Sequence, residues 1–289
     1  MLTLTLGTFA LSINHLLLLL ALALATLVGW RVAKRSGDNP ESVLFGLFML
    51  AMLVARISFV IAYWSYFRED PLQVLDIRDG GFLAWPGVLA LLSGTVLFCW
   101  RRPALRRPLG FGLGSGLAFW LLASLSMTLY EQGTRLPEIT LRNAQGQEVQ
   151  LRDYQGGPLV INLWATWCPP CRREMPVLQK AQHERQDVTF LFVNQAESMQ
   201  SVSTFLMTQG LNLDNVLFDG TGKLAQSVGS MALPTTLLYN AEGRLLGTHL
   251  GELSQASLAR ALENFGPPKS TSATPATARK PLCPSTATC

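Results

Sequence analysis

Long apolar runs fill most of the first 130 residues, and short apolar runs separated by polar stretches fill the rest. A helix of about 20 apolar residues is long enough to cross a hydrocarbon core about 30 Å thick. The pattern therefore predicts an α-helical membrane bundle of four transmembrane helices, at about 9–30, 43–67, 82–100 and 109–130. We assign residues 1–130 to this bundle.

The first apolar run has the length of a secretory signal core, which carries positive charge in front of it. Residues 1–10 carry no charge, whereas Arg31, Lys34 and Arg35 follow the run. The sequence therefore favours a retained membrane helix over a cleaved signal.

Lysine and arginine are concentrated in two of the predicted loops, after the first and the third helix. The loop after the second helix has mixed charge. Because loops rich in lysine and arginine stay in the cytoplasm, both termini are expected on the periplasmic side of a bacterial inner membrane. The basic loop residues are Arg31, Lys34, Arg35, Arg101, Arg102, Arg106 and Arg107.

The net charge of +4 also comes from the first half of the chain. Residues 1–130 hold ten Lys and Arg against six Asp and Glu, while residues 131–289 hold thirteen of each. The basic residues thus adjoin apolar runs, which indicates a lipid bilayer rather than a nucleic acid as the partner.

Arg56 falls inside the second predicted helix, and an ionisable residue within a membrane span suggests a functional role. The alternative is that Arg56 faces the bundle or a polar pocket and holds the helices together. We favour this alternative, since the predicted spans contain no acidic residue to pair with it.

Residues 31–87, including ARISFVIAYWSYFREDPLQVLDIRDGGFLAWPG, resemble the N-terminal half of prolipoprotein diacylglyceryl transferase. That family has a functional His shortly after a Gly-Gly pair, and alignment on Gly80 and Gly81 puts Trp85 there. The family's later Gly-Arg/Gly-Asn-Phe signature does not occur before Tyr130. The resemblance implies a membrane scaffold, and it leaves a lipid-binding or vestigial transferase module with a redox passenger domain as an alternative.

The second half alternates strand and helix patterns. Residues 139–141 and 149–151 flank a turn and predict a hairpin, and 159–165 and 188–193 are short apolar runs typical of buried strands. Further elements are expected at 171–185, 198–208, 216–218, 235–239, 245–250 and 254–265. This order predicts an α/β fold with a mixed central sheet at 136–266, after a short linker at 131–135.

The linker spans at most roughly 17 Å when extended, so the α/β domain is expected close to the bilayer. From residue 267 to 289 the chain is rich in Pro, Ser, Thr and Ala without an apolar period. This tail is predicted to be disordered.

Trp167-Cys-Pro-Pro-Cys171 lies where a predicted buried strand gives way to a helix. Two intervening residues let the sulfurs of Cys168 and Cys171 meet within one turn. A helix N-terminus stabilises a thiolate, and Pro170 suits the first turn. The pattern predicts a redox-active dithiol in which Cys168 is the exposed nucleophile and Cys171 resolves the mixed disulfide.

A zinc site and a purely structural disulfide are the alternatives for this pair. Structural zinc needs four ligands, and the fold has no second closely spaced Cys pair, while His183 and His249 are isolated. We therefore expect no metal and no cofactor beyond the Cys168–Cys171 disulfide. A structural disulfide does not account for the strand–Trp–Cys–helix context.

Residues 136–266 resemble the TlpA/ResA family of membrane-anchored thioredoxins, in the segments 162–171, 193–197 and 233–236. The resemblance implies a thioredoxin-like fold with Pro234 as a cis-proline beside the disulfide. It implies that Glu197 tunes proton transfer at the cysteines. It also implies substrate contacts at Trp167, Pro169, Pro170, Leu233 and Thr235.

Asn162 stands where cytoplasmic thioredoxins have a buried Asp. This departure favours Glu197 as the carboxyl group that tunes proton transfer at the cysteines. Cys99 is alone in the third predicted helix, so the membrane half has no reactive pair of its own. Cys283 and Cys289 lie in the predicted tail, where they form an accessory pair or none.

The resemblance implies a membrane-anchored periplasmic thiol-disulfide oxidoreductase. Its leading interpretation is a reductase of protein disulfides, for example in cytochrome c maturation or in keeping other periplasmic thiol proteins reduced. Electrons would come from a separate membrane thiol donor of the DsbD or CcdA type. A disulfide oxidase or isomerase is the alternative within the same enzyme class.

Overall fold

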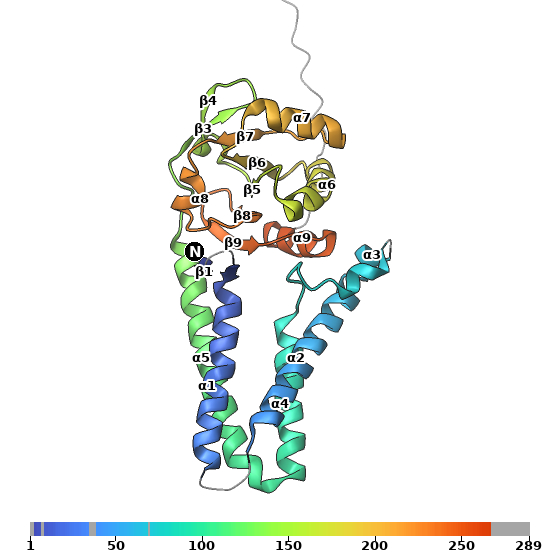
Figure 1. Cartoon of the computed structure of the whole chain (residues 1–289), viewed down its shortest axis with the longest axis vertical. Helices are drawn as coiled ribbons and strands as arrows, with labels where there is room; N and C mark the ends of the chain where they lie inside the picture. Colours follow the sequence, from blue (N-terminus) through green and yellow to red (C-terminus); the bar gives the residue numbers. More distant parts are fainter. Residues whose placement is uncertain (1–2, 7–8, 35–38, 69, 267–289) are drawn as a thin grey trace, which may run out of the picture.

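The structure is a computed structural model that describes residues 3–6, 9–34, 39–68 and 70–266. A helical half is followed by an α/β half with a mixed sheet, as the sequence predicts (Figure 1). The predicted tail with Cys283 and Cys289 lies outside the described residues, as does Arg35.

Four long apolar helices make up most of the helical half. Among the described residues, these four are long and apolar enough to cross a membrane. The first begins at Ile13 and not at residue 9 as predicted, because residues 9–12 form a strand that pairs antiparallel with residues 3–6. The elements are β1 (Thr3–Leu6), β2 (Phe9–Ser12), α1 (Ile13–Ala33), α2 (Glu41–Ala62), α3 (Trp64–Phe67), η1 (Pro71–Leu75), α4 (Ala84–Arg101), η2 (Pro103–Leu105) and α5 (Arg106–Gly133).

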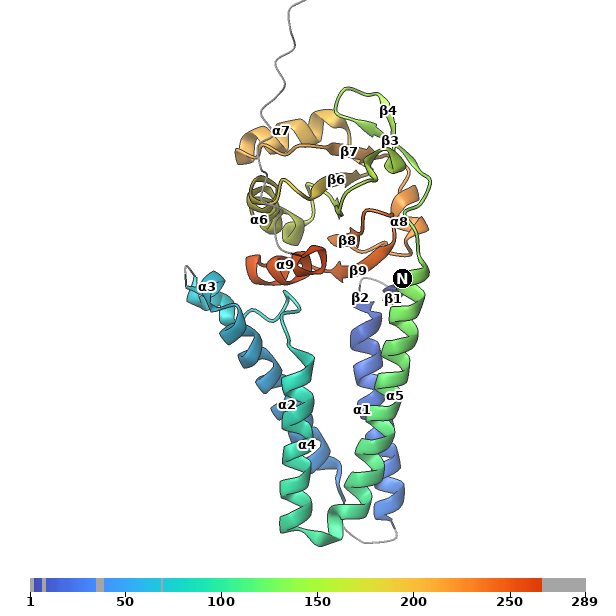
Figure 2. The same cartoon turned by 180° about the vertical axis from the view of Figure 1, so that it is seen from behind.

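The long helices form two pairs, α1 with α5 and α2 with α4, and the pairs diverge toward the α/β half (Figures 1 and 2). Small residues let the helices of a pair approach closely. A Cβ added to Gly112 would lie 2.7 Å from the carbonyl oxygen of Ala25, and one on Gly87 would lie 2.8 Å from that of Ala51. Backbone proximity thus sets the packing of both pairs.

Arg56 of α2 is buried against the connection between α3 and α4. Its guanidinium donates to Oδ1 of Asp79 at 2.9 Å. The acidic partner therefore lies in a loop rather than in a span, and Arg56 holds this loop on the bundle. The guanidinium also donates to the carbonyl oxygens of Gln73, Val74, Asp76 and Gly81.

The α/β half is built on a seven-stranded mixed sheet with the order β4-β3-β7-β6-β5-β8-β9. Strands β5, β6 and β7 are parallel, and the other pairs are antiparallel. The elements are β3 (Thr140–Asn143), β4 (Glu148–Gln150), η3 (Leu151–Tyr154), β5 (Leu159–Trp164), α6 (Pro169–Glu184), β6 (Thr189–Gln195), α7 (Met199–Gln209), β7 (Val216–Asp219), α8 (Lys223–Ser227), β8 (Thr235–Tyr239), β9 (Leu245–Leu250), α9 (Gln255–Leu262) and η4 (Glu263–Phe265).

The two faces of the sheet bury different helices. Helices α6, α7 and α9 share one apolar cluster with Val160 and Trp164 of β5. The short η3 and α8 share the other cluster with Ile161 and Leu163. Because side chains alternate along a strand, Asn162 faces the same side as α6, which matters for the site below.

The connection between the halves is shorter than predicted, since α5 continues to Gly133. The next residues bond to the outer side of β9. Leu245 N donates to Thr134 O at 3.0 Å, Leu136 N donates to Gly243 O at 2.8 Å, and Arg135 forms a bridge with Arg244. The connection thus bonds to the turn between β8 and β9 and to the first residue of β9.

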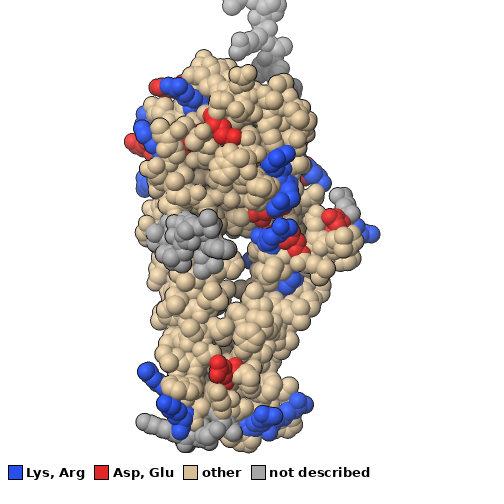
Figure 3. Space-filling view, viewed as in Figure 1, with Lys and Arg blue, Asp and Glu red and all other residues tan. Residues whose placement is uncertain are grey.

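Charged side chains are distributed unevenly over the helical half. Figure 3 shows Lys and Arg gathered at the end of the bundle farthest from the α/β half, with a largely uncharged surface above them. The basic residues at the C-terminal end of α1 and around the connection from α4 to α5 are Arg31, Lys34, Arg101, Arg102, Arg106 and Arg107.

Candidate functional site

Cys168 lies in the turn that follows the fully buried strand β5, and α6 begins directly after Cys168. Cys168 is the N-cap of α6, and its Sγ accepts a hydrogen bond from Cys171 N at 3.3 Å. Pro169 and Pro170 occupy the first turn, where a missing N–H costs nothing. Cys168 and Cys171 form a disulfide whose Cα atoms lie 5.3 Å apart.

The expectation that Cys168 is exposed is wrong for this disulfide form. Cys168 is 3% exposed and Cys171 is fully buried, because both belong to the apolar cluster under α6 together with Leu233. The exposed neighbours are Trp167, at 67%, and Pro169. A protein that binds here therefore contacts the apolar side chains of Trp167 and Pro169 before it reaches the buried sulfur atoms.

The loop before β8 carries the predicted proline. The Leu233–Pro234 peptide bond is cis, as the resemblance implies. Leu233 is half-buried, which leaves part of it for a partner. Thr235 is fully buried and its hydroxyl donates to Ala232 O at 2.6 Å, so its contact with a substrate stays a prediction.

Glu197 lies in the loop after β6 and is half-buried. Its carboxylate accepts hydrogen bonds from Thr166 N at 2.7 Å and from Asn194 Nδ2 at 2.7 Å, and the Thr166 hydroxyl donates to its other oxygen. Since Thr166 lies two residues before Cys168, Glu197 ties the end of β6 to the turn that presents the disulfide.

A second carboxyl group, Glu174, lies on α6 one turn after Cys171 and is fully buried. Asn162 Nδ2 donates to its Oε1 at 2.7 Å, and Leu253 N donates to its Oε2 at 3.0 Å. Burial raises the pKa of Glu174 to about 8, although both hydrogen bonds favour the charged form. This side chain can therefore take up or release a proton near neutral pH.

Asn162 is itself held in place by the neighbouring strand β8, because its Nδ2 also donates to Thr236 Oγ1 at 3.0 Å. The carboxyl group that bonds to Asn162 is Glu174, not Glu197. Asn162 therefore gives Glu197 no added role, contrary to the prediction, since Glu174 occupies the buried position beside it.

Glu174 was not among the predicted site residues, although the sequence carries a signal for it. Residues three or four apart share a helix face, and Cys171, Met175 and Leu178 mark the buried face of α6. Glu174 falls on that face, three residues after Cys171. A charged residue on an apolar face beside a reactive cysteine is the pattern that identifies it.

Arg172 and Arg173 are the basic residues that directly follow Cys171, and both are engaged elsewhere. Arg173 makes an ion pair with Glu252 at 2.6 Å, and Arg172 lies over the Phe205 ring at 5.4 Å. The groups left to favour a thiolate at Cys168 are the helix N-terminus and the Cys171 amide.

The geometry combines three chemical elements. Cys168 and Cys171 hold two electrons as a disulfide at a helix N-terminus, and Glu174 provides a proton acceptor beside the buried cysteine. Exposed Trp167 and Pro169 provide an apolar contact surface. Together they suit thiol–disulfide exchange with another protein.

Comparison with known proteins gives a matching family model for each half of the chain. A family model described as Redoxin matches residues 131–262, and one described as prolipoprotein diacylglyceryl transferase matches residues 2–112. The thiol-disulfide oxidoreductase ResA of Geobacillus thermodenitrificans is 30% identical over 159 residues, which cover 51% of this chain and 91% of that protein.

Two further matches have similar identity and coverage. ResA of Bacillus subtilis is 29% identical over 156 residues, which cover 50% of this chain and 87% of that protein. The crystal structure of a thioredoxin-family thiol:disulfide interchange protein from Chlorobium tepidum is 26% identical, with a TM-score of 0.41, and the match covers 46% of this chain and 95% of that one.

Proposed function

We propose that this chain, which belongs to the ResA family of thiol-disulfide oxidoreductases, reduces protein disulfides through Cys168 and Cys171. The Cys168 thiolate attacks one sulfur of the substrate disulfide and forms a mixed disulfide. Cys171 then attacks Cys168 Sγ, releases the substrate dithiol and leaves the Cys168–Cys171 disulfide. Two electrons pass to the substrate, and the chain's own cysteine pair is the redox group.

The observation that carries this proposal is the buried Glu174 one turn after Cys171. Cys171 must lose a proton before it attacks, and it is fully buried from solvent. A carboxylate with a pKa near 8 can accept this proton near neutral pH, and a neutral carboxyl group can return it during recharging.

We infer a periplasmic location for the α/β half from the charge at the opposite end of the bundle. Lys and Arg gather there (Figure 3), and such loops remain in the cytoplasm. Residues 1–130 then anchor the chain in the bacterial inner membrane, and a membrane thiol donor of the DsbD or CcdA type recharges the disulfide. Candidate substrates are the cysteine pairs of apocytochromes c and other exported thiol proteins.

The test is the reduction potential of the Cys168–Cys171 couple in the full chain, with Cys99, Cys283 and Cys289 replaced by Ser. Equilibration with glutathione and dithiothreitol buffers is expected to give a value near or below about −270 mV, the thioredoxin range. A value near about −120 mV would overturn the direction and identify a disulfide oxidase.

Insulin reduction gives an independent check. Cys168→Ser is expected to abolish it, and Cys171→Ser to trap a mixed disulfide that non-reducing electrophoresis detects. Full activity in Cys168→Ser would contradict the proposed nucleophile.

A second candidate function comes from the match of residues 2–112 to prolipoprotein diacylglyceryl transferase. Trp85 occupies the position where the resemblance calls for a His, and its side chain is 67% exposed at the start of α4. We therefore propose this half as an anchor. Transfer of diacylglyceryl to a lipoprotein signal peptide, insensitive to Cys168→Ser, would overturn this assignment.

A further inference from the structure

The helical half touches the α/β half through α9. Ser254, the N-cap of α9, donates from Oγ to Asp79 Oδ2 at 2.8 Å. Farther along, Arg260 donates to Phe82 O at 2.6 Å, and Tyr63 donates to a carboxylate oxygen of Glu263 at 2.8 Å. The α/β half is thus held by directed bonds to the membrane half.

Asp79 is itself fixed before it reaches Ser254. Its Oδ1 accepts from Arg56 at 2.9 Å and from Gly81 N at 3.0 Å, and the residue is 5% exposed. Arg56 also bonds to four carbonyl oxygens of the same loop. The carboxylate therefore has one oxygen held in the helical half and one oxygen directed at the α/β half.

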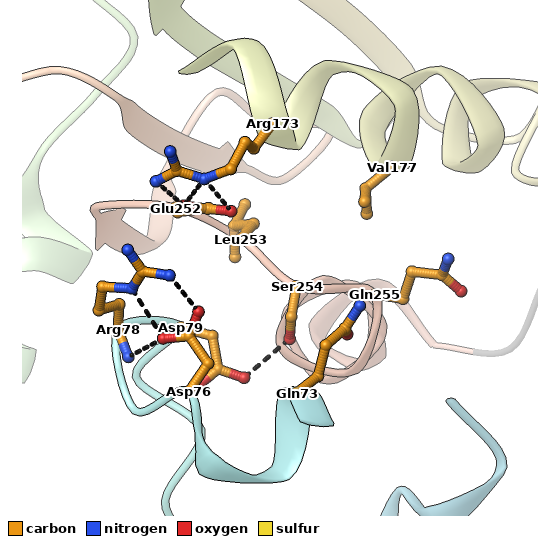
Figure 4. Close-up of a pocket in the computed structure, with 10 residues that line it drawn as sticks. All are labelled: Gln73, Asp76, Arg78, Asp79, Arg173, Val177, Glu252, Leu253, Ser254 and Gln255. Atoms are coloured by element: carbon orange, nitrogen blue, oxygen red, sulfur yellow. Dashed lines mark hydrogen bonds and ion pairs between the residues drawn. The ribbon is translucent and has the colours of Figure 1, made fainter. Parts of the chain in front are cut away.

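The contact with Ser254 leads directly to the redox site. Leu253 is the preceding residue, is 1% exposed, and donates its backbone N–H to Glu174 Oε2 at 3.0 Å. Leu253 and Ser254 belong to the short segment between β9 and α9, so the position of the Ser254 side chain constrains the Leu253 amide. Figure 4 shows Asp79 and Ser254 facing each other below α6.

We propose that Asp79, held by Arg56, is a positioning residue for the redox centre: it fixes Ser254 and thereby keeps the Leu253 N–H on Glu174. This inference rests on the proton-transfer role proposed above for Glu174. The membrane half is then part of the reaction machinery, because it supplies the anchor for one of the two donors to the buried carboxyl group.

Other charged groups near Leu253 are paired with one another. Arg173 bonds to Glu252 on the α/β half, and Arg78 bonds to Asp76 on the loop. These pairs, with Asp79 and Ser254, line a cavity of about 300 Å³ between the halves (Figure 4). His249 bonds to Glu252 O, and burial lowers its pKa.

Among these groups, Glu252 adds a repulsion that raises the pKa of Glu174, while the Leu253 and Asn162 bonds lower it. Loss of the Leu253 bond is therefore expected to raise the pKa of Glu174 further. The change would appear in any thiol reaction that depends on the protonation of this carboxyl group.

The experiment measures alkylation of Cys168 by iodoacetamide in the reduced full chain, in lipid nanodiscs, from about pH 5 to about pH 10. Cys99, Cys283 and Cys289 are replaced by Ser, and mass spectrometry locates the adduct. In the plot of Cys168 alkylation rate against pH, titration of Glu174 gives an inflection. Ser254→Ala is expected to move this inflection upward by about half to one pH unit. Ser254→Thr keeps the hydroxyl and is expected to restore the parent profile.

Two controls separate positioning from helix capping and from general docking. Ser257→Ala removes the other half of the α9 capping box without touching Asp79, and Tyr63→Phe removes a different contact between the halves. Both are expected to leave the inflection in place, and Glu174→Gln is expected to abolish it.

An unshifted profile in Ser254→Ala would overturn the proposal, as would an equal shift in Ser257→Ala or an inflection that survives Glu174→Gln. Iodoacetamide replaces the protein substrate in this assay. A chain that fails to reduce insulin but shows the predicted shifts would therefore refute the proposed function and leave the positioning role standing.

Discussion

The helical half buries Arg56 and the α/β half buries Glu174, and the two charged groups are solvated very differently. The Arg56 guanidinium donates to one carboxylate and four carbonyl oxygens. The Glu174 carboxylate has two donors for two oxygens, and burial raises its pKa to about 8.

This difference separates a structural charge from a reactive one. A buried ion whose hydrogen bonds are all made holds its neighbours in place. A buried carboxyl group with sparse bonding remains close to neutrality and can exchange a proton at physiological pH. We read Arg56 as the first kind and Glu174 as the second.

The largest effect is expected from Arg56→Gln. Removal of the guanidinium leaves Asp79 buried without its counter-ion, which typically costs about 3–5 kcal/mol. Thermal unfolding of the full chain in detergent is expected to show a correspondingly lower midpoint. Lys34→Gln, at an exposed helix end, is the control and is expected to behave like the parent. A midpoint unchanged in Arg56→Gln would contradict the structural role of this charge.

Glu174→Gln is expected to change how stability depends on pH. The folded pKa of Glu174 is raised above its unfolded value, so the folded state binds more protons between about pH 4.5 and about pH 8. Stability from this group is present below that window and is lost as pH rises through it. The loss is on the order of a few kcal/mol.

The measurement is chemical denaturation of the oxidised full chain across this window. The parent is expected to lose stability with rising pH more steeply than Glu174→Gln. The variant is also expected to reduce insulin more slowly by about 10²-fold, the range for loss of a general base. Parallel pH curves for the two proteins would show that Glu174 does not titrate in the window.

Packing in the helical half is expected to affect stability but not thiol chemistry. Gly112→Ala places a Cβ 2.7 Å from Ala25 O, and such overpacking costs about 1–3 kcal/mol. Gly114→Ala, two residues along α5, meets nothing within 4 Å and is the matched control. Unfolding midpoints in detergent should separate the two variants, whereas their alkylation profiles should coincide with the parent's.

The smallest effect is expected from Glu197→Gln. One oxygen of the amide can still accept from Thr166 N or Asn194 Nδ2, so about 1 kcal/mol of stability is at stake. Denaturation midpoints and the pH profile of insulin reduction test this. If Glu197→Gln flattens the pH profile while Glu174→Gln leaves it unchanged, the proton acceptor is Glu197 and not Glu174.

Features set by neighbouring residues could be predicted from the sequence. The proline pair after Cys168 opens α6, as the sequence predicts. This signal acts within one helical turn, so it survives without knowledge of the fold. The four long helices follow for the same reason, since apolar length alone specifies them.

Features set by distant contacts could not be predicted in the same way. The bond from Asn162 to Glu174 joins β5 to α6, and the bond from Ser254 to Asp79 spans 175 residues. Short elements were also missed. The five-residue α8 has little periodicity of its own, and the apolar run from Phe9 concealed the strand Phe9–Ser12, which pairs with Thr3–Leu6.

The contact of Thr134, Arg135 and Leu136 with the start of β9 has a practical consequence for recombinant work. An uncovered edge strand offers free N–H and C=O groups to other chains and promotes aggregation. A soluble fragment cut at residue 136, the boundary that the sequence suggests, discards Thr134 and Arg135 and so bares the backbone of Arg244 and Leu245 at the start of this edge strand. A fragment that begins before Thr134 is expected to stay monomeric at concentrations where the shorter one self-associates.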